Sequence, residues 1–226
     1  MSAAFLWVMV AAMGAYQGAN APMGWVYAVA RGFERRSARA TLGAAAALAA
    51  GHYLAMLAVL LPAALAITLL GVDPTAIEPW LGIGFIGFGL FKLLRARHPR
   101  ALARIPPREP IRWSFAMALA HCGSPFMMLA PLVELSLLLD AGRFGATLPQ
   151  HLAWSAGLAV ALPAAMAAPL LLVASSLALV VYRVLGLRGV TRLWINLDLG
   201  WALIFIAMAA MMLVMAHGAA SMPAMH

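Results

Sequence analysis

The sequence predicts an all-α integral membrane protein with six transmembrane helices, arranged as two inverted three-helix repeats in which helices 1 and 4 are broken. Three observations predict this fold class: the composition, the placement of the basic residues, and proline-centred segments that recur in the two halves. Of the 226 residues, 65% are hydrophobic and 10% are charged, whereas soluble domains carry about 25% charged residues. The composition therefore excludes a soluble protein, and six spans of about 20 residues leave no room for a large soluble catalytic domain.

Apolar runs bounded by charged residues define the expected spans. The predicted spans are residues 3–30, 40–70, 79–96, 112–139, 151–182 and 193–216. Each run is long enough to cross a hydrocarbon core of about 30 Å as a helix.

The same boundaries divide the chain into four parts. Residues 1–96 form a first three-helix half, and a basic cytoplasmic linker of residues 97–111 follows it. Residues 112–217 form the second three-helix half, and residues 218–226 form an extracytoplasmic tail that contains Met and His.

The basic residues occur in alternate gaps between the spans. All but one of the 15 Lys and Arg residues lie between spans 1 and 2, 3 and 4, or 5 and 6. The remaining gaps hold Asp73, Glu78, Asp140 and the single Arg143. Because basic loops stay on the cytoplasmic side, both termini are expected to face outward. The net charge of +8 therefore indicates orientation in a membrane, and no nucleic-acid partner is expected.

Two pairs of segments recur at corresponding places in the two halves. Residues 58–66 match residues 159–167 at seven of nine positions. Residues 18–24 and 121–127 each lie inside a span and contain a proline surrounded by small residues. Because each half has an odd number of spans, the second half must cross the membrane in the opposite direction, as in many secondary transporters. Proline and glycine also occur in spans for packing alone, but the matching positions favour a binding site formed by broken helices.

Polar side chains from three spans are expected to meet near the membrane centre. At a rise of about 1.5 Å per residue, His52 in span 2 and His121 in span 4 lie at similar depths, and Asn20 falls at nearly the same level. Backbone groups exposed by a broken helix are tolerated at this depth only beside protein or a cavity. The predicted substrate-binding residues are Asn20, Pro22, His52, His121, Ser124 and Pro125.

Some of these side chains also suit a metal ion. Imidazole, thiol and thioether groups together bind soft or borderline metals such as Cu(I), Zn(II) and Ni(II). The predicted metal ligands are His52, His121, Cys122, Met127 and Met128. Each has a plainer interpretation, because buried histidines often hydrogen-bond a neighbouring helix, while methionine and a lone cysteine often fill a core. On the ligand chemistry of these side chains, a transition metal is expected as a substrate. No resident cofactor is assigned.

Two acidic residues are candidates for proton coupling. Glu134 lies near the outer end of span 4, and Asp198 lies within span 6. A carboxylate in a low-dielectric environment can exchange protons near neutral pH. The alternative is that both are solvated residues at the membrane interface.

The six-span plan, the break at Asn20-Ala21-Pro22, the pair Gly51-His52 and the matching break in span 4 resemble the LysE superfamily of small bacterial membrane proteins. That group includes amino-acid exporters, nickel/cobalt exporters, urease-accessory-type proteins and CcdA-like thiol-reducing units. The segments 22–30, 120–121 and 194–198 resemble most a branch without an assigned substrate. The resemblance implies a transporter-like fold in a bacterial inner membrane.

The sequence departs from two characterised branches of that superfamily. The redox branch uses a cysteine in each half, whereas Cys122 is the single cysteine of this chain. The nickel/cobalt branch carries a His-x4-Asp-His signature in an early span, and this signature is absent here. The resemblance therefore leaves the substrate open.

Together these observations predict a secondary transporter that exports a small solute, with a transition-metal ion (Cu, Ni or Zn) favoured as substrate. The chain has no G-x-x-x-x-G-K-[ST] motif, so an ion gradient would supply the energy. The alternatives are an amino-acid exporter of LysE type and a non-transporting subunit or assembly factor. The second alternative rests on a small-residue stripe suited to close packing, also in a homodimer, formed by Gly82, Gly84, Gly87 and Gly89. An enzyme is not expected, since the signature motifs of hydrolases and metalloproteases are absent.

Overall fold

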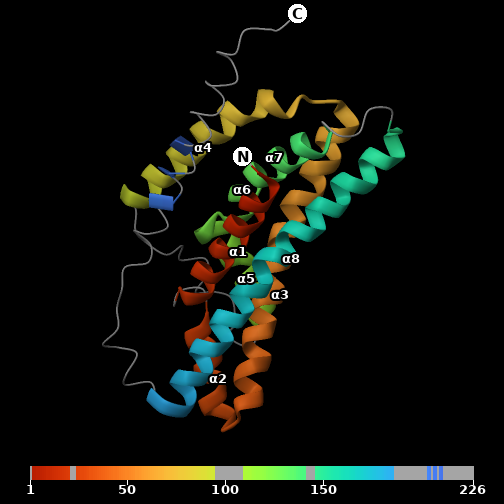
Figure 1. Cartoon of the computed structure of the whole chain (residues 1–226). Helices are drawn as coiled ribbons and strands as arrows, with labels where there is room; N and C mark the ends of the chain where they lie inside the picture. The colour runs from red at the N-terminus through yellow and green to blue at the C-terminus, as the bar shows by residue number, and fades with distance from the viewer. Residues whose placement is uncertain are drawn as a thin grey trace, which may run out of the picture.

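The computed structural model describes residues 2–20, 24–94, 109–140 and 146–185, together with residues 203–204, 206–207 and 209–210. Within these ranges the chain is helical apart from short turns and contains no β-strand. The α-helices are α1 (Ala3–Ala19), α2 (Trp25–Arg35), α3 (Ala38–Leu70), α4 (Pro74–Leu94), α5 (Pro110–Met117), α6 (Ser124–Met127), α7 (Leu129–Asp140) and α8 (Leu148–Val180) (Figure 1). The all-helical prediction is therefore confirmed for the described part of the chain.

Within the part of the chain that the structure describes, two helices are long and apolar enough to cross a membrane. They are α3, with 33 residues, and α8 with its continuation, which together span the 37 residues Leu148–Val184. The segments Pro110–Ala120 and Ser124–Leu138 meet the same criterion when they are taken as one span with a bend of 58°. Among the described residues, α1 and the central part of α4 are shorter apolar helices.

The helices α3 and α8 run side by side along the length of the molecule (Figure 1). They are antiparallel, because Thr68 near the end of α3 hydrogen-bonds Ser155 near the start of α8, with 2.7 Å between the hydroxyl oxygens. At the other end, Ala44 of α3 and Ala178 of α8 belong to one buried cluster. This pair forms the frame against which α1, α2 and α5 pack.

Helix α1 lies against α8 through two glycines one turn apart. A Cβ at Gly14 would overlap the backbone oxygen of Met166, and a Cβ at Gly18 would overlap that of Leu170. Small residues at such positions let two helix backbones approach closely. Since both contacts advance in the same direction along the chain, α1 and α8 are parallel.

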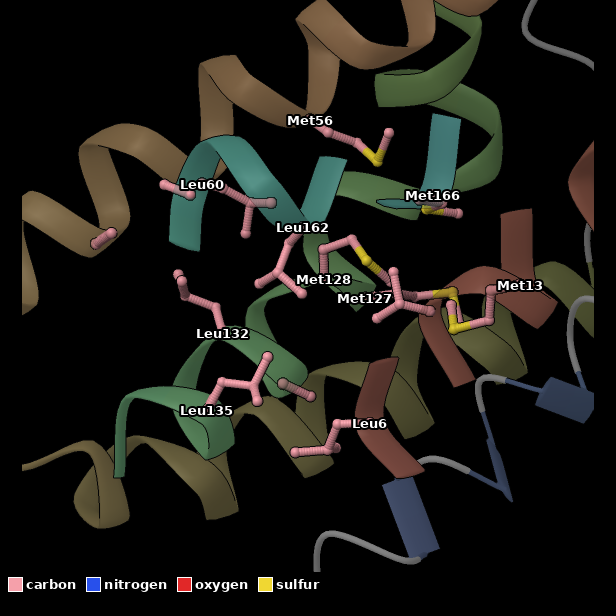
Figure 2. Packing of buried hydrophobic residues seen from close by; sticks show 14 of the residues in the cluster. Leu6, Met13, Met56, Leu60, Met127, Met128, Leu132, Leu135, Leu162 and Met166 are labelled. Atoms are coloured by element: carbon pink, nitrogen blue, oxygen red, sulfur yellow. The ribbon is translucent and has the colours of Figure 1, made fainter. Parts of the chain in front are cut away.

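The largest buried cluster lies between α1, α3, α4, α7 and α8. Figure 2 shows the methionines at one end of this cluster and Leu6, Leu132 and Leu135 at the other. Ala209, from the described part of predicted span 6, is fully buried in the same cluster, and Ile204 packs against it. This part of span 6 is thus helical and belongs to the core.

Three local features differ in detail from what the sequence predicts. Glu78, expected in a loop, lies in the first turns of α4 and is buried. The expected glycine stripe is divided, since Gly82 and Gly89 are buried whereas a Cβ at Gly84 or Gly87 would meet open space. The first predicted segment, residues 3–30, is interrupted as expected, but its second helix continues to Arg35. The linker of residues 97–111 lies mostly outside the described residues.

Candidate substrate-binding site

The first helix break separates α1 from α2. Helix α1 ends at Ala19, and the N–H of the next residue, Asn20, donates to the Gln17 carbonyl. Helix α2 begins after Gly24, whose φ of 109° favours glycine over other residues. The indole Nε1–H of Trp25 donates to the Ala19 carbonyl at 3.1 Å. This bond supplies a partner to one of the carbonyls that a helix end leaves open.

The second break lies between α5 and α6. A π-helical turn at Ala118–Cys122 ends at Gly123, which has a φ of 63° and donates its N–H to the Ala118 carbonyl at 3.1 Å. Helix α6 begins at Ser124, with Pro125 in its first turn, where proline's missing N–H is tolerated. Single π-turns inside helices occur frequently at functional sites. The helix interruptions predicted in these two segments are thus present, and the two parts around the second one are long and apolar enough for a membrane span when taken together.

Four buried side chains near the breaks have polar atoms without hydrogen-bond partners in the described part of the chain. The atoms are both side-chain polar atoms of Gln17, Oδ1 of Asn20, both ring nitrogens of His52 and Oγ of Ser124. None of these residues is more than 1% exposed. Each unpaired buried group costs about 1–3 kcal/mol. A polar ligand bound among them would supply the missing partners.

The packing register places the residues of α1 and α3 at one level of the bundle. The pairs Thr68–Ser155 and Ala44–Ala178 set the antiparallel register of α3 and α8, which puts His52 opposite Leu170. The contact of Gly18 with Leu170 then brings the end of α1 to the level of His52. Gln17 and Asn20 flank this glycine in the chain.

Ser124 is connected to the same level through α6, which packs on α3. Met127 and Met128, one turn after Ser124, share a buried cluster with Met56, and Met56 lies one turn after His52 on the same face of α3. We refer to Gln17, Asn20, His52 and Ser124 together as the polar level. It lies at the end of the core that faces α2.

Five buried methionines lie about one turn from residues of the polar level, on the side away from α2. They are Met13, Met56, Met127, Met128 and Met166, and none is more than 6% exposed. Figure 2 shows these side chains grouped together, contributed by α1, α3, α8 and the segment after the second break. Met13 stands one turn from Gln17, as Met56 does from His52. We refer to these five residues as the methionine cluster.

The structure describes the side chains of some predicted site residues and not of others. Asn20, His52, Ser124 and Pro125 are buried beside the breaks, and Met127 and Met128 belong to the methionine cluster. His121 and Cys122 lie in the π-helical turn, but their side chains are outside the described part. Pro22 is also outside the described residues, as are Asp198 and the Met/His tail.

Sequence reasoning missed Gln17 and three of the five methionines. A signal for Gln17 exists, because an amide in an apolar helix one turn before a break is unusual inside a membrane. Met13, Met56 and Met166 carry no comparable signal, since methionine is a common core residue. Glu134 is buried on α7, and α4, which carries the buried Glu78, packs against that helix.

The described residues contain no group of three or more His, Cys, Asp and Glu side chains that could hold a metal ion. Of the predicted metal ligands, those whose side chains are described are the His52 imidazole and the thioethers of Met127 and Met128. Comparison of the chain with protein-family models, with curated proteins and with solved structures gives no match.

Proposed function

We propose that the protein is a multi-pass secondary transporter of a bacterial inner membrane that exports a small solute, with both termini on the extracytoplasmic side. The observation that carries this proposal is the polar level: four buried side chains without partners in the described structure, beside two helix breaks. In many transporters, discontinuous helices form the substrate site near the membrane midplane. Unpaired buried polar groups lower the stability of the fold, and an ordinary apolar core contains few of them.

The antiparallel pair α3 and α8 supports the inverted three-helix repeats of the proposal. The two helices have 33 residues each, and the sequence match between the halves aligns Leu61 with Leu162. Leu162 shares a buried cluster with Leu60, the immediate neighbour of its counterpart. When a two-fold axis in the membrane plane relates two neighbouring helices, they run antiparallel and meet near residues that correspond to each other in the two repeats. Alternating access would then be the rocking of one half against the other.

Among substrates, we propose a transition-metal ion, with Cu(I) favoured over Ni(II) and Zn(II). Thioether sulfur is a soft ligand that selects Cu(I), and imidazole also binds copper. The methionine cluster and His52 offer both ligand types within one turn of each other. An amino acid is the second candidate, because the amide and hydroxyl groups of Gln17, Asn20 and Ser124 suit an ammonium and a carboxylate group.

The proposal is tested by transport into or out of proteoliposomes that contain the purified chain. Cu(I) kept reduced, Ni(II), Zn(II), lysine and arginine are supplied in separate assays under an imposed proton gradient. We expect Cu(I) movement that exceeds empty liposomes. His52→Ala is expected to reduce it by about tenfold or more, in line with the loss of one metal ligand.

Replacement of methionine by leucine separates the two substrate classes. The triple variant Met56→Leu/Met127→Leu/Met128→Leu keeps the volume of the core nearly constant but removes three thioethers. Loss of Cu(I) transport in this variant supports the metal, whereas amino-acid transport that survives it supports the second candidate. Leu132→Met, in the leucine end of the same cluster, is the matched control. Absence of transport of every substrate by the folded wild-type protein would overturn the proposal and favour a non-transporting membrane subunit.

A further inference from the structure

A pocket of about 500 Å³ opens where α2, α3 and the start of α5 meet. Helix α2, which supplies part of its lining, lies at the opposite end of the molecule from α4 (Figure 1). Its lining residues are Tyr27, Arg31, Arg35, Ser37, Arg39, Ala40, Gly43, Ala44, Ala47 and Pro110. The pocket is separate from the polar level, and the transport proposal assigns it no role.

Small residues on one face of α3 create the space for this pocket. Ala40, Gly43, Ala44 and Ala47 follow the spacing of a single helix face. A Cβ at Gly43 would meet no atom within 4 Å. The wall of the pocket is therefore apolar and open along about two turns of α3.

The charged end of the pocket is formed by arginines. Arg31 pairs with Glu34 at 2.5 Å, but Arg35 and Arg39 have no ion pair within the described residues. Both are exposed and both line the pocket. Two cationic side chains thus stand at one end of a cavity whose other wall is apolar, and the basic residues at this end belong to a gap that the charge rule assigns to the cytoplasm.

We propose that this pocket binds the phosphate headgroup of one anionic phospholipid from the cytoplasmic leaflet. Arg35 and Arg39 would pair with the phosphate, since guanidinium groups match its geometry. The glycerol and the first carbons of the acyl chains would lie along Ala40, Gly43 and Ala47. Basic pockets between helices on the cytoplasmic side are suited to such headgroups. The apolar wall favours an amphiphile over free phosphate, because free phosphate has no apolar part that could contact this wall.

Lipid retention by the purified full-length chain tests this proposal. Protein in mild detergent is incubated with phosphatidylglycerol, phosphatidylcholine or inorganic phosphate, and native mass spectrometry counts the bound molecules. We expect one phosphatidylglycerol per chain, retained in preference to phosphatidylcholine. Arg35→Gln and Arg39→Gln are each expected to weaken this retention roughly fivefold, as for one basic side chain near an anionic surface.

Two matched pairs of variants distinguish the pocket from general attraction. Gly43→Leu fills the cavity without a charge change, whereas Gly157→Leu makes the same change at another open helical site. Arg36→Gln removes a charge beside Arg35 but outside the lining. Loss of the lipid with Gly43→Leu and retention with both controls are the expected results. Equal retention of the two lipids, normal retention by Gly43→Leu, or binding of inorganic phosphate that displaces phosphatidylglycerol would each overturn the proposal.

Discussion

The end of the α3–α8 pair where Thr68 meets Ser155 and the region around the two breaks differ in whether polar side chains have hydrogen-bond partners. At that end of the pair, the partly buried Thr68 hydroxyl donates to the Ala64 carbonyl at 3.0 Å. Ser155 is then left to donate to Thr68 at 2.7 Å, so both hydroxyls have partners. Around the breaks, Gln17 and His52 are fully buried and their side-chain polar atoms have no partner in the described structure.

This difference separates polar groups that hold helices together from polar groups that have no partner among the described residues. Interhelical hydrogen bonds between hydroxyls are a normal means of helix association in membranes. Unpaired groups are costly, and intramembrane polar residues of this kind are commonly functional. Even close to the breaks, Ser114 donates to the Leu48 carbonyl at 2.6 Å, so the chain is able to satisfy buried groups there. Three experiments test this contrast.

The largest expected effect comes from Gln17→Leu. The substitution keeps the side-chain volume and removes two buried atoms without partners, so we expect the free energy of unfolding to rise by about 1–3 kcal/mol. The measurement is SDS-induced unfolding in mixed micelles. If Gln17 binds the substrate, as the transport proposal requires, the same variant also loses transport activity.

Ser114→Ala is the matched control for this experiment. It removes a satisfied hydrogen bond at a similar depth, so the free energy of unfolding is expected to fall by about 1 kcal/mol. A fall in stability for both variants would show that the Gln17 amide has partners in the folded protein. The contrast between the two regions would then disappear.

A smaller effect is expected for Gly123→Ala at the second break. The φ of 63° at this position costs an alanine about 1–2 kcal/mol, and thermal unfolding should record a corresponding loss. Gly157→Ala, in the regular part of α8, is expected to raise stability by about 0.5–1 kcal/mol, because alanine favours a helix interior. Equal behaviour of the two variants would mean that Gly123 does not adopt the left-handed conformation.

The smallest effect is expected for the pair Thr68→Val and Ser155→Ala. A double-mutant cycle should give a coupling free energy of about 0.6 kcal/mol, the average for interhelical hydrogen bonds in a membrane protein. The measurement uses the same SDS titration. A coupling of zero would place the two hydroxyls out of contact and would change the register of α3 against α8.

Prediction from the sequence succeeded for features that depend on local chemistry. The break beside Asn20 and the break beside Ser124 are foreseen because proline and small residues interrupt an apolar run. The sequence does not separate these sites from Pro62 or Pro163, which lie inside continuous helices. The difference lies in Gly24 and Gly123, whose positive φ values turn the backbone out of the helix, whereas an internal proline removes one hydrogen bond without reversing the chain.

The sequence by itself determined the apolar, helical character of the described chain and the positions of its two breaks, because helix formation and its interruption depend on residues close together in the chain. Only the tertiary structure decided that Gln17 and Met13 join His52 and Met56, since the register between helices is set by contacts such as Gly18 against Leu170. The same reason applies to the pocket on α3. Its small residues are visible in the sequence, but the space above them exists because α2 and α5 stand where they do.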